Sequence, residues 1–248
     1  MRTYSSIGEI IVELGNLSNR AWQVKQGTCA SAGIGMDSMD TRLVAMDGIQ
    51  ADCLACGWWM RTLMGAKRAY QEKIPDNWEA PYLEMVGVGP GFPDGPNRVG
   101  RAEDVMLNYL RNTITTSIQF KLESMFKRIL RSLPGQSSDT PRGYERVVNT
   151  LLTEVGLSVQ GDEKKTLKTL ANLRNSYHSN GIHRGESFSF DLADVHLEFH
   201  DGEKVKCASW HHLLHLLGMT IKVVGSMLSL AAPKLPHGEI KDDFATLP

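Results

Sequence analysis

Hydrophobic residues recur along most of the chain every three to four positions, the spacing of one face of an α-helix. The first such run consists of Ile7, Ile10, Ile11, Leu14 and Leu17. A longer run follows over residues 41–73, and either Ser38 or Asp40 could cap its start by accepting bonds from exposed N–H groups. The intervening segment, GTCASAGIGMDS, is small and rich in glycine. The first part of the chain is therefore predicted to be two helices with a break between them.

Glycine and proline interrupt the pattern at residues 86–100, VGVGPGFPDGPNRVG. Three prolines among these residues exclude a helix interior or a central strand, so we interpret the segment as a linker and domain boundary. Beyond it an amphipathic pattern of about eight turns runs from Val105 to Leu133. Two shorter helical patterns follow, over residues 144–155 and from Asp162 to the Asn180-Gly181 pair. Both residues of that pair tolerate the left-handed conformation that ends a helix.

After residue 185 the period changes from helical to alternating. Residues 188–190 alternate between phenylalanine and serine, and residues 195–199, VHLEF, alternate between apolar and polar. We expect residues 195–199 to pair with residues 205–207 across Asp201-Gly202, a dipeptide favoured in tight turns. The pattern thus predicts a small β-hairpin.

A last helical pattern runs from Trp210 to Leu230, and Pro233 stops it. The predicted fold class is mainly α: a helical bundle with a small hairpin inserted before the last helix, preceded by an N-terminal helical region. The expected divisions are residues 1–100 with no assigned role, a helical domain at 103–233 and a C-terminal tail at 234–248.

Composition and charge narrow the class of protein only slightly. The 248 residues are 42% hydrophobic, enough for a sizeable core, and the formal net charge of -1 gives no whole-chain sign of nucleic-acid or membrane binding. The N-terminus lacks the features of a signal peptide, and charged residues or histidine interrupt the longest apolar stretches. Four cysteines are too few for a disulfide framework. We expect a cytoplasmic protein with no membrane span.

The stretch LANLRNSYHSNGIHRG, residues 170–185, holds the best candidate chemistry. On a helix, Arg174 and His178 lie four residues apart and project from one face. A guanidinium suits phosphate oxygens, an imidazole can transfer a proton, and Asn175 adds a neutral donor and acceptor. These groups suffice for metal-free cleavage of RNA. The alternative is an ordinary helix end, where Arg and His interact with exposed carbonyls and the helix dipole.

The motif LRNSYHSNGIH, preceded by two amphipathic helices and followed by a hairpin and a long apolar helix, resembles the HEPN superfamily (higher eukaryotes and prokaryotes nucleotide-binding domains). The resemblance covers about residues 103–233. Members of this family are small helical bundles, and many are metal-independent endoribonucleases of toxin, antiphage or CRISPR-linked systems. Their motif is an Arg, then a polar residue that is often Asn, and a His after four to six intervening residues. Arg174 and Asn175 match its start, while His178 follows after three residues and His183 after eight.

The resemblance implies a role for each residue of the motif. Arg174 would bind the scissile phosphate, His178 or His183 would transfer a proton, and Asn175 would orient the phosphate or His178. It also implies RNA as substrate, no cofactor, and a homodimer in which the motif helices of two protomers line one cleft. An antitoxin or another defence-system protein is a further expected partner. Residues 1–100 carry no motif that assigns a role, and sensing a trigger or binding a partner are the two hypotheses for them.

Local charge favours RNA binding in this half of the chain. Between Lys121 and Arg184 there are eleven Lys or Arg residues against six Asp or Glu residues. The candidate nucleic-acid-binding residues are Lys127, Arg128, Arg131, Lys164, Lys165 and Lys168. A solvated helix surface would show the same pattern.

Two other functions remain open from the sequence. The domain could be a non-catalytic HEPN-like module that binds RNA, a nucleotide or a protein. Alternatively, the chain could be a zinc-dependent enzyme that uses His196, His200, His211 and His215, because the last two are one helical turn apart. Cys53 and Cys56 also have metal-ligand spacing, but without a second pair we interpret them as buried core residues.

Overall fold

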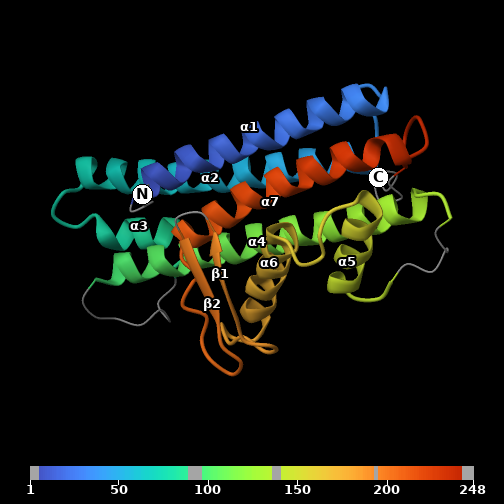
Figure 1. Ribbon diagram of the computed structural model, residues 1–248. Coiled ribbons are helices and arrows are strands. Elements are labelled where there is room, and N and C mark those ends of the chain that lie inside the picture. The colour runs from blue at the N-terminus through green and yellow to red at the C-terminus, as the bar shows by residue number, and fades with distance from the viewer. Residues whose placement is uncertain (1–5, 89–96, 136–140, 193–194, 242–248) are drawn as a thin grey trace.

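The computed structural model describes residues 6–88, 97–135, 141–192 and 195–241. The chain is mostly helical, and a two-stranded antiparallel hairpin precedes the last long helix, as predicted (Figure 1). In chain order the elements are α1 (Ile7–Ala32), α2 (Thr41–Lys73), α3 (Glu79–Met85), α4 (Arg98–Ser132), α5 (Tyr144–Val155), α6 (Asp162–His178), β1 (Phe188–Leu192), β2 (Val195–Phe199), α7 (Trp210–Ala231) and the 3-10 turn η1 (Ala232–Lys234).

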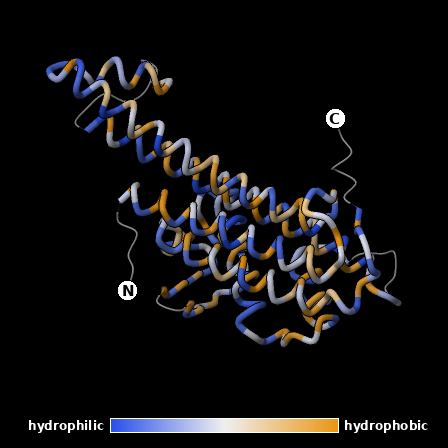
Figure 2. The backbone as a smooth tube through the Cα atoms, turned by 90° about the horizontal axis from the view of Figure 1, so that it is seen from above, coloured by the Kyte–Doolittle hydropathy of each residue, from blue (hydrophilic) through white to orange (hydrophobic). Residues whose placement is uncertain are grey.

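Four long helices, α1, α2, α4 and α7, form the body of the molecule. α1 packs against α2 and α7, and α2 packs against α4 (Figure 1). The hairpin, α5 and α6 lie together on one side of these helices, and α6 contacts both α4 and α7. Hydrophobic stretches recur between hydrophilic ones along the long helices, as the pattern of an amphipathic helix requires (Figure 2).

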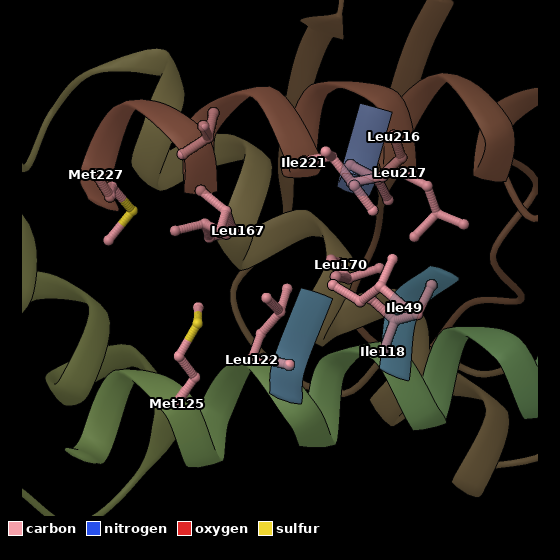
Figure 3. Close-up of a cluster of buried hydrophobic side chains, with 14 of the residues drawn as sticks. Ile49, Ile118, Leu122, Met125, Leu167, Leu170, Leu216, Leu217, Ile221 and Met227 are labelled. Atoms are coloured by element: carbon pink, nitrogen blue, oxygen red, sulfur yellow. The ribbon is translucent and has the colours of Figure 1, made fainter. Parts of the chain in front are cut away.

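The main hydrophobic core lies where α2, α4, α6 and α7 converge. Figure 3 shows Leu122, Leu170 and Leu217 among side chains from these helices that point toward one another, and all three are fully buried. The core includes residues from both sides of the predicted domain boundary, so α1 and α2 pack with the later helices. Most of the predicted linker, residues 89–96, lies outside the described residues.

A second, smaller core lies where the end of α2 and the start of α4 extend beyond the other helices (Figure 2). Its buried members are Tyr82, Leu83, Val99 and Ala102. α3 supplies the first two of these residues, and we did not predict this helix from the sequence. It has only seven residues and contains Pro81, which is tolerated because it lies in the first turn.

The break expected between the first two helices begins later than predicted. α1 continues through GTCASA to Ala32, and Gly33, with φ 65°, ends it in the left-handed conformation. Cys29 and Ala32 are buried, and Thr28 donates a hydrogen bond to the Val24 carbonyl. Small residues therefore extend α1 by packing closely instead of interrupting it. The start of α2 follows the prediction, because the Asp40 carboxylate accepts a hydrogen bond from the N–H of Arg42.

The predicted pairing of the hairpin is wrong, although its place in the chain is confirmed. β2 pairs with β1, with Phe188 opposite Phe199, and not with residues 205–207. The Val205 N–H instead donates a hydrogen bond to the Gly181 carbonyl, which connects this segment to the loop after α6. Gly202 still makes a turn with positive φ, but that turn leads away from the sheet.

The segment after α7 folds back against the start of α2. Leu235 and Ile240 are buried in the main core, and the Thr41 N–H donates to the Ile240 carbonyl at 2.8 Å. These contacts attach residues 235–241 to the helical body.

The stretch Trp210–Lys234, which includes α7, is long and apolar enough to cross a membrane by length and composition. However, 61% of its most apolar window is buried inside the protein. The central helix of a folded core has the same composition, and contacts with α1 and α6 account for its hydrophobic surface here.

Candidate functional site

The candidate site begins with the way α6 ends. Asp162 and Glu163 in the first turn complement the positive end of the helix dipole, and the last helical residue is His178. Asn180 and Gly181 then adopt positive φ angles of 54° and 80°, and the Gly181 N–H donates to the Ser176 carbonyl at 2.8 Å. The predicted termination by these two residues is confirmed.

Arg174, Asn175 and His178 occupy the last two turns of α6, on sides of the helix other than the one that Leu173 and Ser176 bury. The Arg174 guanidinium donates a hydrogen bond from Nη1 to Oδ1 of Asn175 at 3.0 Å. Arg174 is half-buried, whereas Asn175 and His178 are exposed. The 3.6-residue period places Arg174 and His178 one turn apart on one face, with Cβ atoms about 6 Å apart. All three side chains are therefore accessible to a ligand or a second protein.

The environment of His183, the other candidate histidine, differs sharply from that of His178. Its side chain is buried, with its ring 5.3 Å from the ring of Phe199 and 6.2 Å from that of Phe188. Nε2 lies 3.0 Å from the Glu186 carbonyl, and a carbonyl only accepts, so this nitrogen carries a proton. The His183 backbone also bonds Glu203 and Gly202. His183 packs the base of the hairpin and is not exposed beside the Arg174 face.

A pocket of about 260 Å³ lies between α5 and α6 and brings Asn175 together with two of the predicted basic residues, Lys164 and Lys168. Its lining is Gly143, Tyr144, Glu145, Val148, Lys164, Lys168, Ala171, Asn172 and Asn175. The pocket thus adjoins the Arg174-Asn175 hydrogen bond. It offers two amide side chains and two cations, groups that bind phosphate or base edges.

Acidic neighbours moderate the charge of both pocket lysines. Lys164 lies 3.5 Å from Glu145, and Lys168 lies 3.1 Å from Glu186 with its ammonium over the Phe188 ring. Both carboxylates are well exposed, so these pairs are screened by solvent and can rearrange when an anion approaches. Lys165, the third predicted lysine of α6, is exposed beside Asp162 at 3.5 Å.

Tyr144 lines this pocket, and its hydroxyl oxygen is buried. Among the described residues it has no hydrogen-bond partner. Burial is the main cause that raises the pKa of Tyr144 far above its usual value, and the Glu123 carboxylate adds to the effect. Tyr144 therefore stays protonated, so its hydroxyl can donate one hydrogen bond and can also accept one. The sequence analysis missed Tyr144, Glu145 and Asn172, whose importance depends on how α5 packs against α6.

The other basic group that we predicted lies on α4. Lys127 forms an ion pair with Glu123 at 2.5 Å, and Arg128 donates to the Lys241 carbonyl at 3.1 Å. Arg131 is exposed in the last turn of α4. The aromatic contact of Phe126 with Tyr144, with ring centroids 6.4 Å apart, connects this end of α4 to the pocket wall.

The four histidines of the zinc hypothesis do not form a metal centre. His196 bonds Asp191 at 2.6 Å and His200 bonds Glu198 at 2.9 Å, both on the exposed hairpin. His211 and His215 contact each other on α7 with ring centroids 4.7 Å apart. Within residues 6–88, 97–135, 141–192 and 195–241, no three His, Cys, Asp or Glu side chains converge as a metal site requires. The alternating direction of strand side chains and the separation of strand and helix keep these rings apart.

Cys53 and Cys56 are buried core residues, as predicted. Burial is the main cause that raises the pKa of each thiol to about 12, and the nearby Asp52 carboxylate raises it further. A thiol with so high a pKa is a poor nucleophile and a poor metal ligand near neutral pH.

No protein-family model, curated protein or solved structure matches this chain. The assignment of a role to the end of α6 therefore depends on the geometry of that surface and on the chemistry of its side chains.

Proposed function

We propose that this protein is a metal-independent endoribonuclease of the HEPN type, which acts as a homodimer through Arg174, Asn175 and His178. The observation that carries the proposal is the position of this group at the end of α6, where Asn175 and His178 are exposed and Arg174 is half-buried, beside a pocket lined by Lys164 and Lys168. An Arg and a His at the accessible end of this helix can contact a substrate. If the same two side chains were buried, they would serve only to stabilise the fold.

In the proposed reaction His178 takes the proton of a ribose 2′-hydroxyl as the oxygen attacks the adjacent phosphate. The phosphorus–5′-oxygen bond breaks, which leaves a 2′,3′-cyclic phosphate and a 5′-hydroxyl end. Arg174 stabilises the charge that develops on the phosphate oxygens, and its guanidinium fork suits two of them. The hydrogen bond from Arg174 to Asn175 restrains the guanidinium for this role.

The leaving 5′-oxygen needs a proton, and a dimer would supply a second imidazole for this purpose. Pairing of two α6 ends would also cover Arg174 and lower the local dielectric constant, which strengthens its interaction with phosphate. Lys164 and Lys168 would hold the RNA backbone nearby. A defence-associated toxin fits this chemistry, with an antidote protein as the partner that covers the same surface.

His178 is favoured over His183 as the proton acceptor on structural grounds. The Nε2 atom of His183 is used by the Glu186 carbonyl, and the ring is enclosed by Phe188 and Phe199. His178 is exposed at the helix end. Three residues intervene between Arg174 and His178, and this i, i+4 spacing keeps both side chains on one helical face.

The test is cleavage of mixed RNA by the purified full chain in excess EDTA. We expect fragments with 2′,3′-cyclic phosphate ends, a loss of about 10²–10⁴-fold in rate with His178→Ala, and a comparable loss with Arg174→Ala. The matched controls His237→Ala and Arg68→Ala change exposed residues far along the chain and should leave the rate unchanged. Sedimentation equilibrium of the same samples measures whether the active species is a dimer.

The non-catalytic alternative is favoured by one observation, the pocket that combines two amides and two lysines. In that case the protein would bind RNA or a nucleotide without cleaving it, and Lys168→Gln would weaken binding. RNA binding with no cleavage under any condition would overturn the ribonuclease proposal and support this alternative.

A further inference from the structure

A second cavity lies between α1 and α7, and none of its lining residues belongs to α6. The two helices run parallel and very close. A Cβ added at Gly218 would lie 2.7 Å from Nη1 of Arg20, and one added at Gly225 would lie 3.0 Å from Cγ2 of Val24. The absence of a side chain at Gly225 thus lets Val24 of α1 pack close to α7, and at Gly218 it leaves room for the Arg20 guanidinium; Figure 1 shows the two helices side by side.

The cavity has a volume of about 600 Å³, within the range of about 300–1,000 Å³ typical of small-molecule sites. It extends from Leu214 to Ser229 along α7, which at 1.5 Å per residue is a length of about 22 Å. Its wall includes the apolar side chains of Val24, Met219 and Ile221. A long, mainly apolar groove of this shape suits an extended chain better than a compact ring system.

The charged residues of the cavity are Glu13, Arg20 and Lys222. Glu13 is buried, and both its oxygens have partners: Asn16 at 2.9 Å and Arg20 at 3.3 Å. The Arg20 side chain is 50% exposed and has five N–H donors, so it can bind a further acceptor. Lys222 is exposed on α7, one turn beyond the Gly218 contact with Arg20. The cavity lining thus holds two cations and a single carboxylate, and the oxygens of that carboxylate are already bonded.

We propose that this cavity binds a small molecule with an unbranched apolar chain and one anionic head group. The chain lies against Val24, Met219 and Ile221, and the head group contacts Arg20 and Lys222. Carboxylate and phosphate heads share the required chemistry, because each offers two or more oxygens to a guanidinium and an ammonium. This proposal is independent of the ribonuclease proposal, since no residue of the cavity belongs to α6.

The experiment is isothermal titration calorimetry of the purified full chain with probes that share a twelve-carbon chain, each below its micelle concentration. We expect dodecanoate or dodecyl phosphate to bind, and dodecanol to bind at least about tenfold more weakly, the factor that one charge-assisted hydrogen bond supplies. The stronger of the two anions identifies the head group. If neither anion binds, or if dodecanol binds as tightly as they do, the proposal is wrong.

Substitutions then locate the head group. Arg20→Gln should abolish most of the anion preference, but it also removes a partner of buried Glu13 and lowers stability. Lys222→Gln changes an exposed residue, so this variant should fold normally and bind dodecanoate about three- to tenfold more weakly while its affinity for dodecanol stays the same. Lys73→Gln, at an exposed lysine in the last turn of α2, is the matched control and should bind like the unmodified chain. Equal affinities of the Lys222 and Lys73 variants for dodecanoate would contradict the assignment.

Discussion

The Asp40 carboxylate and the Arg42 guanidinium form a bidentate ion pair that is completely enclosed by protein. Nε and Nη2 of Arg42 donate to Oδ1 and Oδ2 of Asp40 at 2.8 and 2.7 Å, and the two side chains are 2% exposed or less. The same carboxylate accepts from the Ile240 N–H, and Arg42 donates to the Gly238 carbonyl. One pair of side chains thus caps α2 and attaches the segment that follows α7.

The first prediction concerns this pair. Arg42→Ala leaves the Asp40 charge buried without its counter-ion, so it should lower the free energy of unfolding by about 3–5 kcal/mol. Urea denaturation followed by circular dichroism measures the change. Arg68→Ala, which removes an exposed ion pair with Glu72 on the same helix, should not shift the unfolding midpoint. Equal midpoints for both variants would show that the buried pair contributes nothing.

A second prediction separates the two histidines of the α6 region. His183→Ala removes a buried ring and its bond to the Glu186 carbonyl, so it should lower the free energy of unfolding by about 1–3 kcal/mol. His178→Ala, at an exposed position, should change stability by less than about 0.5 kcal/mol. Urea titrations of both variants test this. RNA cleavage per folded molecule should show the reverse order, with a loss only for His178→Ala.

The third prediction concerns pH. Burial, followed by repulsion from neighbouring histidines, lowers the pKa of His211 and of His212 in the folded protein. The unfolded chain, with imidazole pKa values of about 6.5, then binds more protons than the folded chain as the pH falls through that value. The contribution of these two residues to stability is therefore present above about pH 6.5 and is lost in more acidic solution.

Urea denaturation from pH 5 to pH 8 tests that sign. Replacement of both residues, His211→Gln and His212→Gln, should reduce the rise of stability with pH, whereas His237→Gln at an exposed position should not. His196 acts in the opposite direction, because its hydrogen bond with Asp191 raises its pKa, and it is unchanged in all variants. A double variant with the original pH dependence would refute the prediction.

The fourth prediction is that Cys53 and Cys56 resist alkylation in the folded protein. With pKa values of about 12, only about one thiol in ten thousand is a thiolate at pH 8, and both side chains are buried. Mass spectrometry after treatment with iodoacetamide should find these two residues unmodified until urea is added. Rapid labelling of either residue in native conditions would contradict the burial described above.

The sequence was informative where one helix face is apolar over many turns. The regular spacing in α4 and α7 predicted both helices because burial of a helix stripe repeats every 3.6 residues. The spacing could not predict α3, which has too few residues to show a period. It also gave the wrong strand partner for β2, because Asp201-Gly202 favours a turn without deciding which strand that turn joins.

The candidate site was predictable only in its local part. The end of α6 follows from Asn180 and Gly181, so Arg174 and His178 were correctly expected on its last turns. The burial of His183 depends on two phenylalanines brought together by strand pairing, which no local pattern reveals. The pocket beside Asn175 likewise depends on the packing of α5 against α6.

The parallel contact of α1 with α7 has a consequence for protein synthesis. Nearly 180 residues separate the end of α1 from the start of α7, so the apolar stripe of α1 leaves the ribosome long before this partner is made. Until then α2 can cover only part of α1, and the side of α1 with Arg20 and Val24, which later contacts Gly218 and Gly225, stays open to solvent. The nascent N-terminal helix pair therefore exposes an apolar surface that can aggregate until α7 arrives to cover it.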